Sequence, residues 1–277
     1  MSNKILDIKK LSFYYSNPNI SSSNKWIQIF KDVDIDVDAG SIVGIAGKSG
    51  CGKTTLAKAI VNYFSLSGFK NNRDYKMNGE IIFHDDHNKY NIDNKEYKKI
   101  SPPPIQMVFQ DPRTSLNMRM KLFDQLKESI EIRAKVDKDE LVDKINGISR
   151  DFKILEHLKS TPQDLSGGQR RRFGLAKIIS SNPKLIIADE PVASLDVSIK
   201  QDIMNTLFSL KDRGITIVII SHDISLLKNN ADFIFIMDKG QIVEKWNPKN
   251  MPKQDQTIKL NNDSDYVNQF IETVSKK

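Results

Sequence analysis

Apolar and polar residues alternate in the first part of the chain. Residues 5–9 follow this pattern, and in residues 33–37 valine and isoleucine are separated by aspartates. A period of two predicts strands with one buried face. Residues 41–46 form a short apolar run that leads into a glycine-rich turn, and the apolar residues of 55–64 recur at helical spacing. This order predicts a strand–loop–helix unit.

The second half of the chain contains continuous apolar runs at residues 185–188, 216–220 and 233–237. Such runs are typical of parallel strands that helices cover on both faces. Residues 241–244 follow a Lys-Gly turn and predict a short final strand. Together with the unit above, these runs predict an α/β fold.

Two further segments lie between these halves. Residues 67–104 are rich in Asn, Lys and Asp, and we expect irregular surface there with one strand at 80–83. From Gln110 to about residue 158 the pattern is amphipathic and helical, with Leu122, Leu126 and Ile130 on one face. This pattern predicts a helical subdomain.

Length and composition limit the function classes. The chain has 277 residues and a formal net charge of +7. It contains no stretch near the ~20 apolar residues of a spanning helix, so we expect a cytoplasmic protein. The only tight basic cluster is 170–172, which we interpret as solvated, and nucleic acid is not favoured. The single cysteine, Cys51, excludes an internal disulfide and is consistent with a reducing compartment.

The glycine-rich turn matches the phosphate-loop pattern G-x-x-x-x-G-K-[ST]. Its glycines let backbone N–H groups surround phosphate oxygens at the N-terminus of a helix, where the helix dipole favours anions. We expect Lys53 to reach the β- and γ-phosphates, Thr54 to ligate Mg²⁺ and Thr55 to hydrogen-bond the α-phosphate. The predicted nucleotide-binding residues of this loop are Gly47, Ser49, Gly50, Cys51, Gly52, Lys53, Thr54 and Thr55.

The apolar run 185–188 ends in two carboxylates, Asp189 and Glu190. Ligands of α/β folds bind where parallel strands end, so these side chains are candidates for the reaction site. The run resembles a Walker B strand, which implies that Asp189 holds Mg²⁺ through water. Glu190 would polarise the water that attacks the γ-phosphate.

Residues 165–169, Leu-Ser-Gly-Gly-Gln, resemble the signature motif of ABC ATPases. Ser166 and the N–H groups of Gly167 and Gly168 open a helix and can present donors to an anion, with Gln169 in the same turn. The resemblance implies that this motif acts on ATP held by the opposite subunit.

Other motifs of that family follow in the expected order. Gln110 resembles the Q-loop glutamine that contacts Mg²⁺, and Asp196 resembles the D-loop residue that crosses to a partner. His222 resembles the switch histidine that contacts the γ-phosphate. Tyr15 fits the ring that stacks on adenine, with Tyr14 as an alternative. The catalytic set implied by the resemblance is Lys53, Gln110, Glu190 and His222.

The resemblance implies a P-loop NTPase core of the ABC ATPase type, with an antiparallel β portion and an inserted helical subdomain at about 111–180. The expected ATP-binding domain spans 1–246. A C-terminal tail follows at 247–277, where Tyr266, Phe270 and Ile271 allow a short docking helix.

The sequence also indicates a branch of the family. Residues 108–117, with Glu190-Pro191-Val192, look like the oligopeptide, dipeptide and nickel importer ATPases. This implies ATP and Mg²⁺, two permease subunits, a second ATP-binding subunit that is identical or paralogous, and an extracytoplasmic substrate-binding protein. It implies peripheral attachment to the cytoplasmic face of the membrane, with peptides, a small solute or a nickel complex as cargo.

Three features depart from that branch. Residues 69–104 follow none of its patterns, Ala193-Ser194 inverts the usual Ser-Ala, and no cysteine cluster follows the core. The alternative function is a soluble ABC-type ATPase that acts on ribosomes or DNA. The chain has one cassette and no long heptad insertion, which disfavours it.

Overall fold

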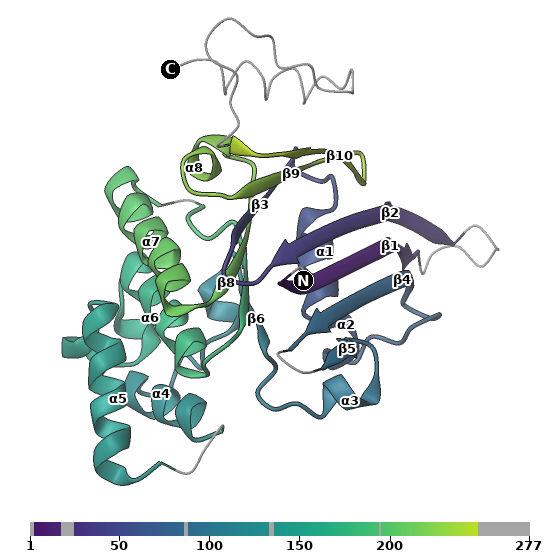
Figure 1. Cartoon of the computed structure of the whole chain (residues 1–277). Helices are drawn as coiled ribbons and strands as arrows, with labels where there is room; N and C mark the ends of the chain where they lie inside the picture. The colour runs from purple at the N-terminus through teal and green to yellow at the C-terminus, as the bar shows by residue number, and fades with distance from the viewer. Residues whose placement is uncertain (1–2, 18–24, 86–87, 133–135, 194, 249–277) are drawn as a thin grey trace, which may run out of the picture.

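The strands of the protein form two sheets in the computed structural model, which describes residues 3–17, 25–85, 88–132, 136–193 and 195–248 (Figure 1). The strands are β1 (Lys4–Ser16), β2 (Trp26–Asp38), β3 (Ile42–Ala46), β4 (Tyr75–His84), β5 (Lys89–Asn91), β6 (Ile105–Val108), β7 (Leu185–Asp189), β8 (Thr216–Ser221), β9 (Phe233–Asp238) and β10 (Gln241–Trp246). The helices are α1 (Lys53–Ile60), α2 (Tyr63–Leu66), α3 (Lys95–Lys98), α4 (Leu122–Glu131), α5 (Lys138–Asp151), α6 (Gly167–Ser180), α7 (Val197–Ser209) and α8 (Ile224–Lys228).

The six-stranded sheet has the order β10-β9-β3-β8-β7-β6. Five of its strands run parallel, and β10 pairs antiparallel with β9. All residues of β3, β7 and β8 are buried, as their apolar runs predict. Because parallel strands end at one edge, the loops after β3, β6, β7 and β8 come together there.

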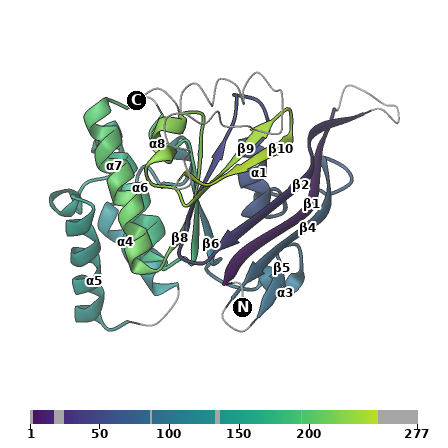
Figure 2. The same cartoon turned by 45° about the horizontal axis from the view of Figure 1, so that its top comes forward.

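The four-stranded sheet is antiparallel, with the order β2-β1-β4-β5, and forms the predicted antiparallel β portion. Helix α1 lies between this sheet and the six-stranded sheet (Figure 2). Its Leu56 and Ile60 share one apolar cluster with Phe13 of β1, Phe30 of β2 and Ile45 of β3. The antiparallel sheet therefore supports the helix that follows the phosphate loop.

Helices α4, α5, α6 and α7 lie on the other side of the six-stranded sheet (Figure 1). The predicted face Leu122, Leu126 and Ile130 is buried against the core that contains Phe173. The subdomain bounds of about 111–180 stay a prediction, and the docking helix expected in the tail lies outside the described residues. None of the helices in the described ranges is long and apolar enough to cross a bilayer.

The helix predicted over 55–64 differs from the structure. Helix α1 ends at Ile60, and Asn62 adopts a left-handed φ of 57° before α2 begins at Tyr63. The buried amide of Asn62 donates to the carbonyl of Ile92, 2.9 Å away. The helical spacing of apolar residues continues across this break to Phe64, so the sequence pattern did not reveal the turn.

The irregular surface expected at 67–104 is also wrong in part. Strand β4 has ten residues rather than the four expected at 80–83, and β5 and α3 follow it. Residues of β4 pair with β1 along nearly its whole length. The polar residues of this segment lie in a strand because they pair with β1, which is sixty or more residues away in sequence and so gives no local signal.

The basic cluster 170–172 was predicted to be solvated, and the structure contradicts this. Arg170 donates to two backbone carbonyls of the segment before α6. Arg171 is buried and donates to the carbonyl of Phe109, and Arg172 pairs with the carboxylate of Asp202. Each of the three side chains reaches a partner on another part of the chain. Three consecutive arginines in a sequence do not indicate such partners.

Candidate nucleotide-binding site

The phosphate loop joins β3 to α1 through a backbone that requires glycine. A Cβ at Gly47 would lie 2.3 Å from the carbonyl oxygen of Met237 and 2.8 Å from Sγ of Cys51. Gly50 and Gly52 have φ values of 83° and 109°. The loop is therefore tight at its start and left-handed at two later positions, where other residues are strained.

Gly47→Ala is expected to prevent ATP binding and to lower the free energy of unfolding by roughly 2 kcal/mol, since the added methyl must displace backbone. Gly50→Ala is the matched control, because open space surrounds its Cβ. There we expect a loss of about 1 kcal/mol from the positive φ alone. Denaturant unfolding and nucleotide titration measure both effects. Equal stability of the two variants would contradict the steric argument.

Lys53 is buried inside this loop. Its Nζ donates to the carbonyls of Gly47 at 2.7 Å and Lys48 at 2.9 Å, and lies 3.8 Å from Sγ of Cys51. Burial raises the pKa of the Cys51 thiol, and the charge of Lys53 opposes that rise. The loop thus holds one positive charge among backbone groups.

Asp189 and Thr54 meet where β7 ends. The Asp189 carboxylate is buried and accepts a hydrogen bond from the Thr54 side chain. Its Oδ1 has no hydrogen-bond partner within the described part of the chain. Burial raises the pKa of Asp189, while the Thr54 hydrogen bond lowers it. A hydroxyl beside a carboxylate oxygen without a protein partner is a donor set that fits Mg²⁺ and its waters.

Asp189→Asn is expected to raise the free energy of unfolding of the nucleotide-free chain at neutral pH by roughly 1 kcal/mol, since it removes a buried charge. A raised folded-state pKa means that the wild-type penalty applies above that pKa and disappears as the pH falls toward the unfolded value. The advantage of the variant should therefore shrink on acidification. Urea unfolding at several pH values measures it, and a variant less stable at neutral pH would contradict the expectation.

Glu190 and His222 form a hydrogen-bonded pair. Glu190 Oε1 accepts from the backbone N–H of His222 at 2.9 Å and from its Nδ1 at 2.7 Å. The hydroxyl of Ser221 lies 3.4 Å from Oε2. Glu190 has a φ of 45°, a strained value for this residue type, and its own N–H donates to the carbonyl of Ile220. These contacts hold the carboxylate in one orientation.

One pocket of about 400 Å³ unites these groups at the carboxyl edge of the parallel sheet. It is lined by Ile29, Ser49, Gly50, Gly52, Lys53, Thr54, Thr55, Gln110, Asp189, Glu190, Ala193 and His222. The structure therefore brings together the phosphate loop, both carboxylates, Gln110 and His222, while their individual roles stay predictions. Ile29 and Ala193 were not predicted as pocket residues, and Ile29 lies in β2, where no sequence motif marks it.

Tyr15 is linked to this pocket and Tyr14 is not. Tyr15 packs edge-on against Phe13, with ring centroids 5.0 Å apart, and its hydroxyl is hydrogen-bonded to Thr55. Burial raises the pKa of the Tyr15 hydroxyl. The Tyr14 hydroxyl accepts a hydrogen bond from exposed Gln28. The geometry favours Tyr15 as the adenine-stacking ring, which stays a prediction.

The signature motif lies apart from the pocket. Ser166 caps α6, since its Oγ accepts from the N–H of Gln169 at 3.3 Å and its own N–H donates to Gln169 Oε1 at 2.9 Å. A Cβ at Gly167 would meet open space, and one at Gly168 would contact Ile199. Asp196 is exposed at the start of α7 and makes no side-chain cap there. These residues do not line the pocket that contains Lys53.

The chain is similar to known transport proteins over most of its length. Residues 30–193 match the family model described as ABC transporter. The oligopeptide transport ATP-binding protein OppF of Streptococcus mutans is 33% identical, covering 87% of this chain and 74% of that protein. OppF of Bacillus subtilis is 32% identical over 88% of this chain and 76% of its own length. The dipeptide transport ATP-binding protein DppF of Lactococcus lactis subsp. cremoris is 33% identical, covering 87% and 74%.

Solved structures share the fold. The structure of cbiO1 from Clostridium perfringens, part of the ABC transporter complex cbiONQ, aligns with a TM-score of 0.67 at 25% identity over 89% of this chain and 90% of that chain. An ATP-binding cassette in a dimeric post-hydrolysis state, bound to ADP and Pi, aligns with a TM-score of 0.72 at 24% identity over 89% and 100%. The relatives named above are all transport ATP-binding proteins, and none of them favours the alternative on ribosomes or DNA. This chain belongs to the ABC transporter family and is one of its ATP-binding, ATP-hydrolysing subunits.

Proposed function

We propose that this subunit hydrolyses ATP to power the uptake of peptides, or of a related small solute or nickel complex, through separate permease subunits. The carboxylate of Glu190, hydrogen-bonded by His222 in the lining of the phosphate-loop pocket, is the observation that carries the hydrolytic role. The resemblance to OppF and DppF supports peptides as the cargo class.

The residues of the pocket have different roles in the proposed hydrolysis. Lys53 and the loop N–H groups bind the phosphates, and His222 contacts the γ-phosphate while it orients Glu190. Thr54 and Gln110 would hold Mg²⁺ directly, and Asp189 through water. The ion would supply positive charge that offsets the negative charge of the phosphates. Glu190 accepts a proton from the attacking water or aligns that water.

We further propose that two ATP-binding subunits, identical or paralogous, act as a pair at the cytoplasmic face of the membrane. Ser166 and Asp196 are at element N-termini outside the pocket of their own chain. A partner subunit would complete each site with these residues. Two permease subunits and an extracytoplasmic substrate-binding protein complete the proposed transporter.

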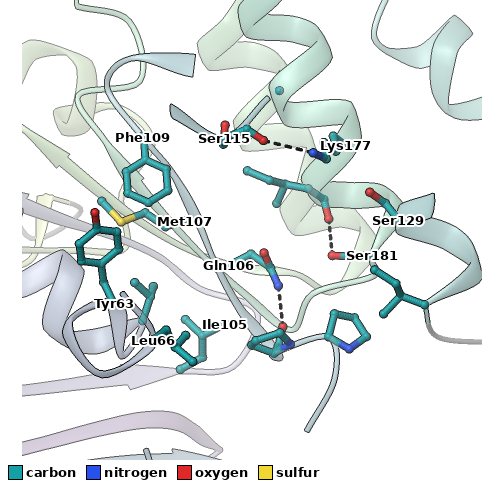
Figure 3. Close-up of a pocket in the computed structure, with 16 residues that line it drawn as sticks. Tyr63, Leu66, Ile105, Gln106, Met107, Phe109, Ser115, Ser129, Lys177 and Ser181 are labelled. Carbon is teal, nitrogen blue, oxygen red and sulfur yellow. Dashed lines mark hydrogen bonds between the residues drawn. The ribbon is translucent and has the colours of Figure 1, made fainter. Parts of the chain in front are cut away.

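A groove of about 360 Å³ is our candidate for permease binding (Figure 3). Tyr63 and Leu66 of α2 lie across the groove from Lys177 of α6 in Figure 3. Ile132, which follows α4, also lines the groove. Leu66 and Ile132 are 62% and 52% exposed at its edge. An apolar groove with exposed large side chains beside the Gln110 loop suits a short helix of the permease.

Charge reversal on α4 is expected to reduce transport more than ATP affinity. Asp124→Lys with Glu128→Lys alters the exposed side of that helix, and Ile132→Glu alters the groove itself. The control is Asp143→Lys with Lys144→Glu, which reverses exposed charges on α5. We expect transport by reconstituted vesicles to fall roughly tenfold for the Asp124/Glu128 variant and for Ile132→Glu. The α5 control should transport normally. Normal transport with the other two variants would move the coupling surface elsewhere.

Cargo is tested on the complex that co-purifies with this chain from membranes. Reconstituted with its binding protein, the complex should hydrolyse ATP faster when peptides are supplied. Stimulation by nickel alone would assign the metal branch instead. Co-purification with ribosomes and no permease would overturn the transport function.

A further inference from the structure

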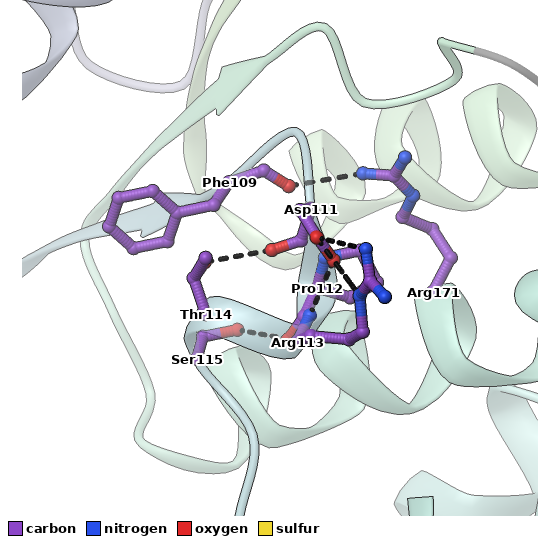
Figure 4. Close-up of polar contacts among 7 residues, drawn as sticks. All are labelled: Phe109, Asp111, Pro112, Arg113, Thr114, Ser115 and Arg171. Carbon is purple, nitrogen blue, oxygen red and sulfur yellow. Dashed lines mark hydrogen bonds and ion pairs between the residues drawn. The ribbon is translucent and has the colours of Figure 1, made fainter. Parts of the chain in front are cut away.

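Gln110 lies in the sequence between Phe109 and Asp111, which are drawn together with Arg171 of α6 in Figure 4. Arg171 is 5% exposed, and its Nη1 donates to the carbonyl oxygen of Phe109 at 3.0 Å. Asp111, on the other side of Gln110, attracts the same guanidinium. Burial lowers the pKa of Arg171, and the charge of Asp111 opposes this. A guanidinium stays protonated in proteins, so the buried side chain carries a positive charge. One side chain thus acts on both neighbours of Gln110.

The turn after Gln110 is stabilised by hydrogen bonds among its own residues. Asp111 Oδ1 accepts from the N–H of Arg113 at 2.9 Å, and its carboxylate forms a fork with the Arg113 guanidinium at 2.8 and 3.0 Å. These hydrogen bonds lower the pKa of Asp111. Thr114 Oγ1 donates to the Asp111 carbonyl at 2.7 Å. The Asp111 carboxylate is therefore fixed by hydrogen bonds within its own turn. The attachment of α6 to the chain next to Gln110 is the hydrogen bond from Arg171 to the Phe109 carbonyl.

Helix α6 is attached to the same segment at a second point. Lys177 Nζ donates to the carbonyl oxygen of Ser115 at 3.1 Å. Arg171, Gly174 and Lys177 are spaced three residues apart and lie on one side of the helix, and a Cβ at Gly174 would contact Pro112 at 3.9 Å. Two cationic side chains with burial-lowered pKa values thus hold residues 109–115 against α6 at both ends.

We infer that Arg171 is a positioning residue that fixes Gln110 to the signature helix, so that displacement of α6 at Ser166 is passed to Gln110 in the ATP pocket. Arg171 lies five residues after the capping serine on one continuous helix. A helix transmits displacement along its axis, and a charged donor on a carbonyl in a low-dielectric site is a strong attachment. Arg171 does not line the ATP pocket, so it acts through Gln110.

The test compares Arg171→Met with Lys177→Met in the full chain. We expect Arg171→Met to lower kcat roughly tenfold and to change the KM for ATP by less than about twofold, because misplacement of a catalytic group affects turnover more than binding. Lys177→Met breaks the attachment five residues from Gln110 and should lower kcat by less than about threefold. Arg171→Lys keeps a cationic donor and should recover part of the loss.

A double-mutant cycle with Gln110→Ala separates this inference from the proposed function, on which it rests. If Arg171 acts through Gln110, Arg171→Met should cause no further loss in the Gln110→Ala background. Active sites are titrated with nucleotide, so that kcat refers to folded molecules even where a variant is less stable. Unchanged hydrolysis in Gln110→Ala would refute the role of Gln110. A full additional loss from Arg171→Met, or equal effects of Arg171→Met and Lys177→Met, would overturn the inference about Arg171.

Discussion

Glu190→Gln is expected to bind ATP as well as the unaltered subunit does and to lose at least about 100-fold in kcat. The amide keeps the size of the side chain and an oxygen that can accept from the His222 N–H, 2.9 Å away. It cannot take a proton from water at neutral pH. Glu190 also lies after the end of β7, whereas the phosphate loop that binds the nucleotide follows β3. Binding and turnover should therefore separate.

Lys53→Ala provides the contrasting result. It removes the charge held inside the phosphate loop, so ATP affinity itself should fall. Equilibrium nucleotide binding and steady-state phosphate release, measured on both variants, decide between the two residues. Unaltered turnover in Glu190→Gln would assign the catalytic carboxylate to another side chain.

Ser166→Arg is expected to leave nucleotide binding by the monomer intact and to reduce hydrolysis by the subunit pair at least about 100-fold. Ser166 lies outside the pocket that contains Lys53 and Glu190, so the substitution does not alter that pocket. In a head-to-tail pair, the N-terminus of α6 would face the ATP of the partner, where N–H donors stabilise phosphate charge. An arginine side chain there blocks closure.

Ser166→Ala is the matched control for that variant. Both substitutions remove the hydroxyl that accepts from the Gln169 N–H, at a cost of about 1 kcal/mol to the helix, but only arginine adds bulk and charge. Thermal unfolding should therefore be similar for the two. Hydrolysis should be lost far more completely with arginine.

If the chain pairs with itself, mixing the Ser166→Arg and Lys53→Ala proteins tests whether Ser166 acts on ATP bound by the partner subunit. In the mixed pair, the altered loop faces the altered signature and the other site is native. Partial hydrolysis from two inactive proteins is the expected result, provided that one native site turns over alone. Strong hydrolysis by monomeric Ser166→Arg would exclude action in trans.

The grouping of most residues in the candidate nucleotide pocket was predictable from sequence, because it depends on local chain geometry. The phosphate loop requires glycine at positions such as 47 and 52, and such requirements appear directly as residue identity. Asp189 and Glu190 end an apolar run that forms a buried parallel strand. Parallel strands end at one edge whatever the sequences between them, so the grouping of Gln110, Asp189, Glu190 and His222 follows from strand order.

Tertiary structure decided the features that depend on distant partners. The polar segment 75–84 forms a strand because β1 pairs with it, and Asn62 breaks the first helix because the carbonyl of Ile92 accepts from its amide. Arg171 cannot be told apart from Arg170 and Arg172 in the sequence, yet it is buried and donates to the carbonyl of Phe109 beside Gln110. Residue type and spacing specify local backbone geometry, whereas the burial of a polar side chain is set by the element that packs against it.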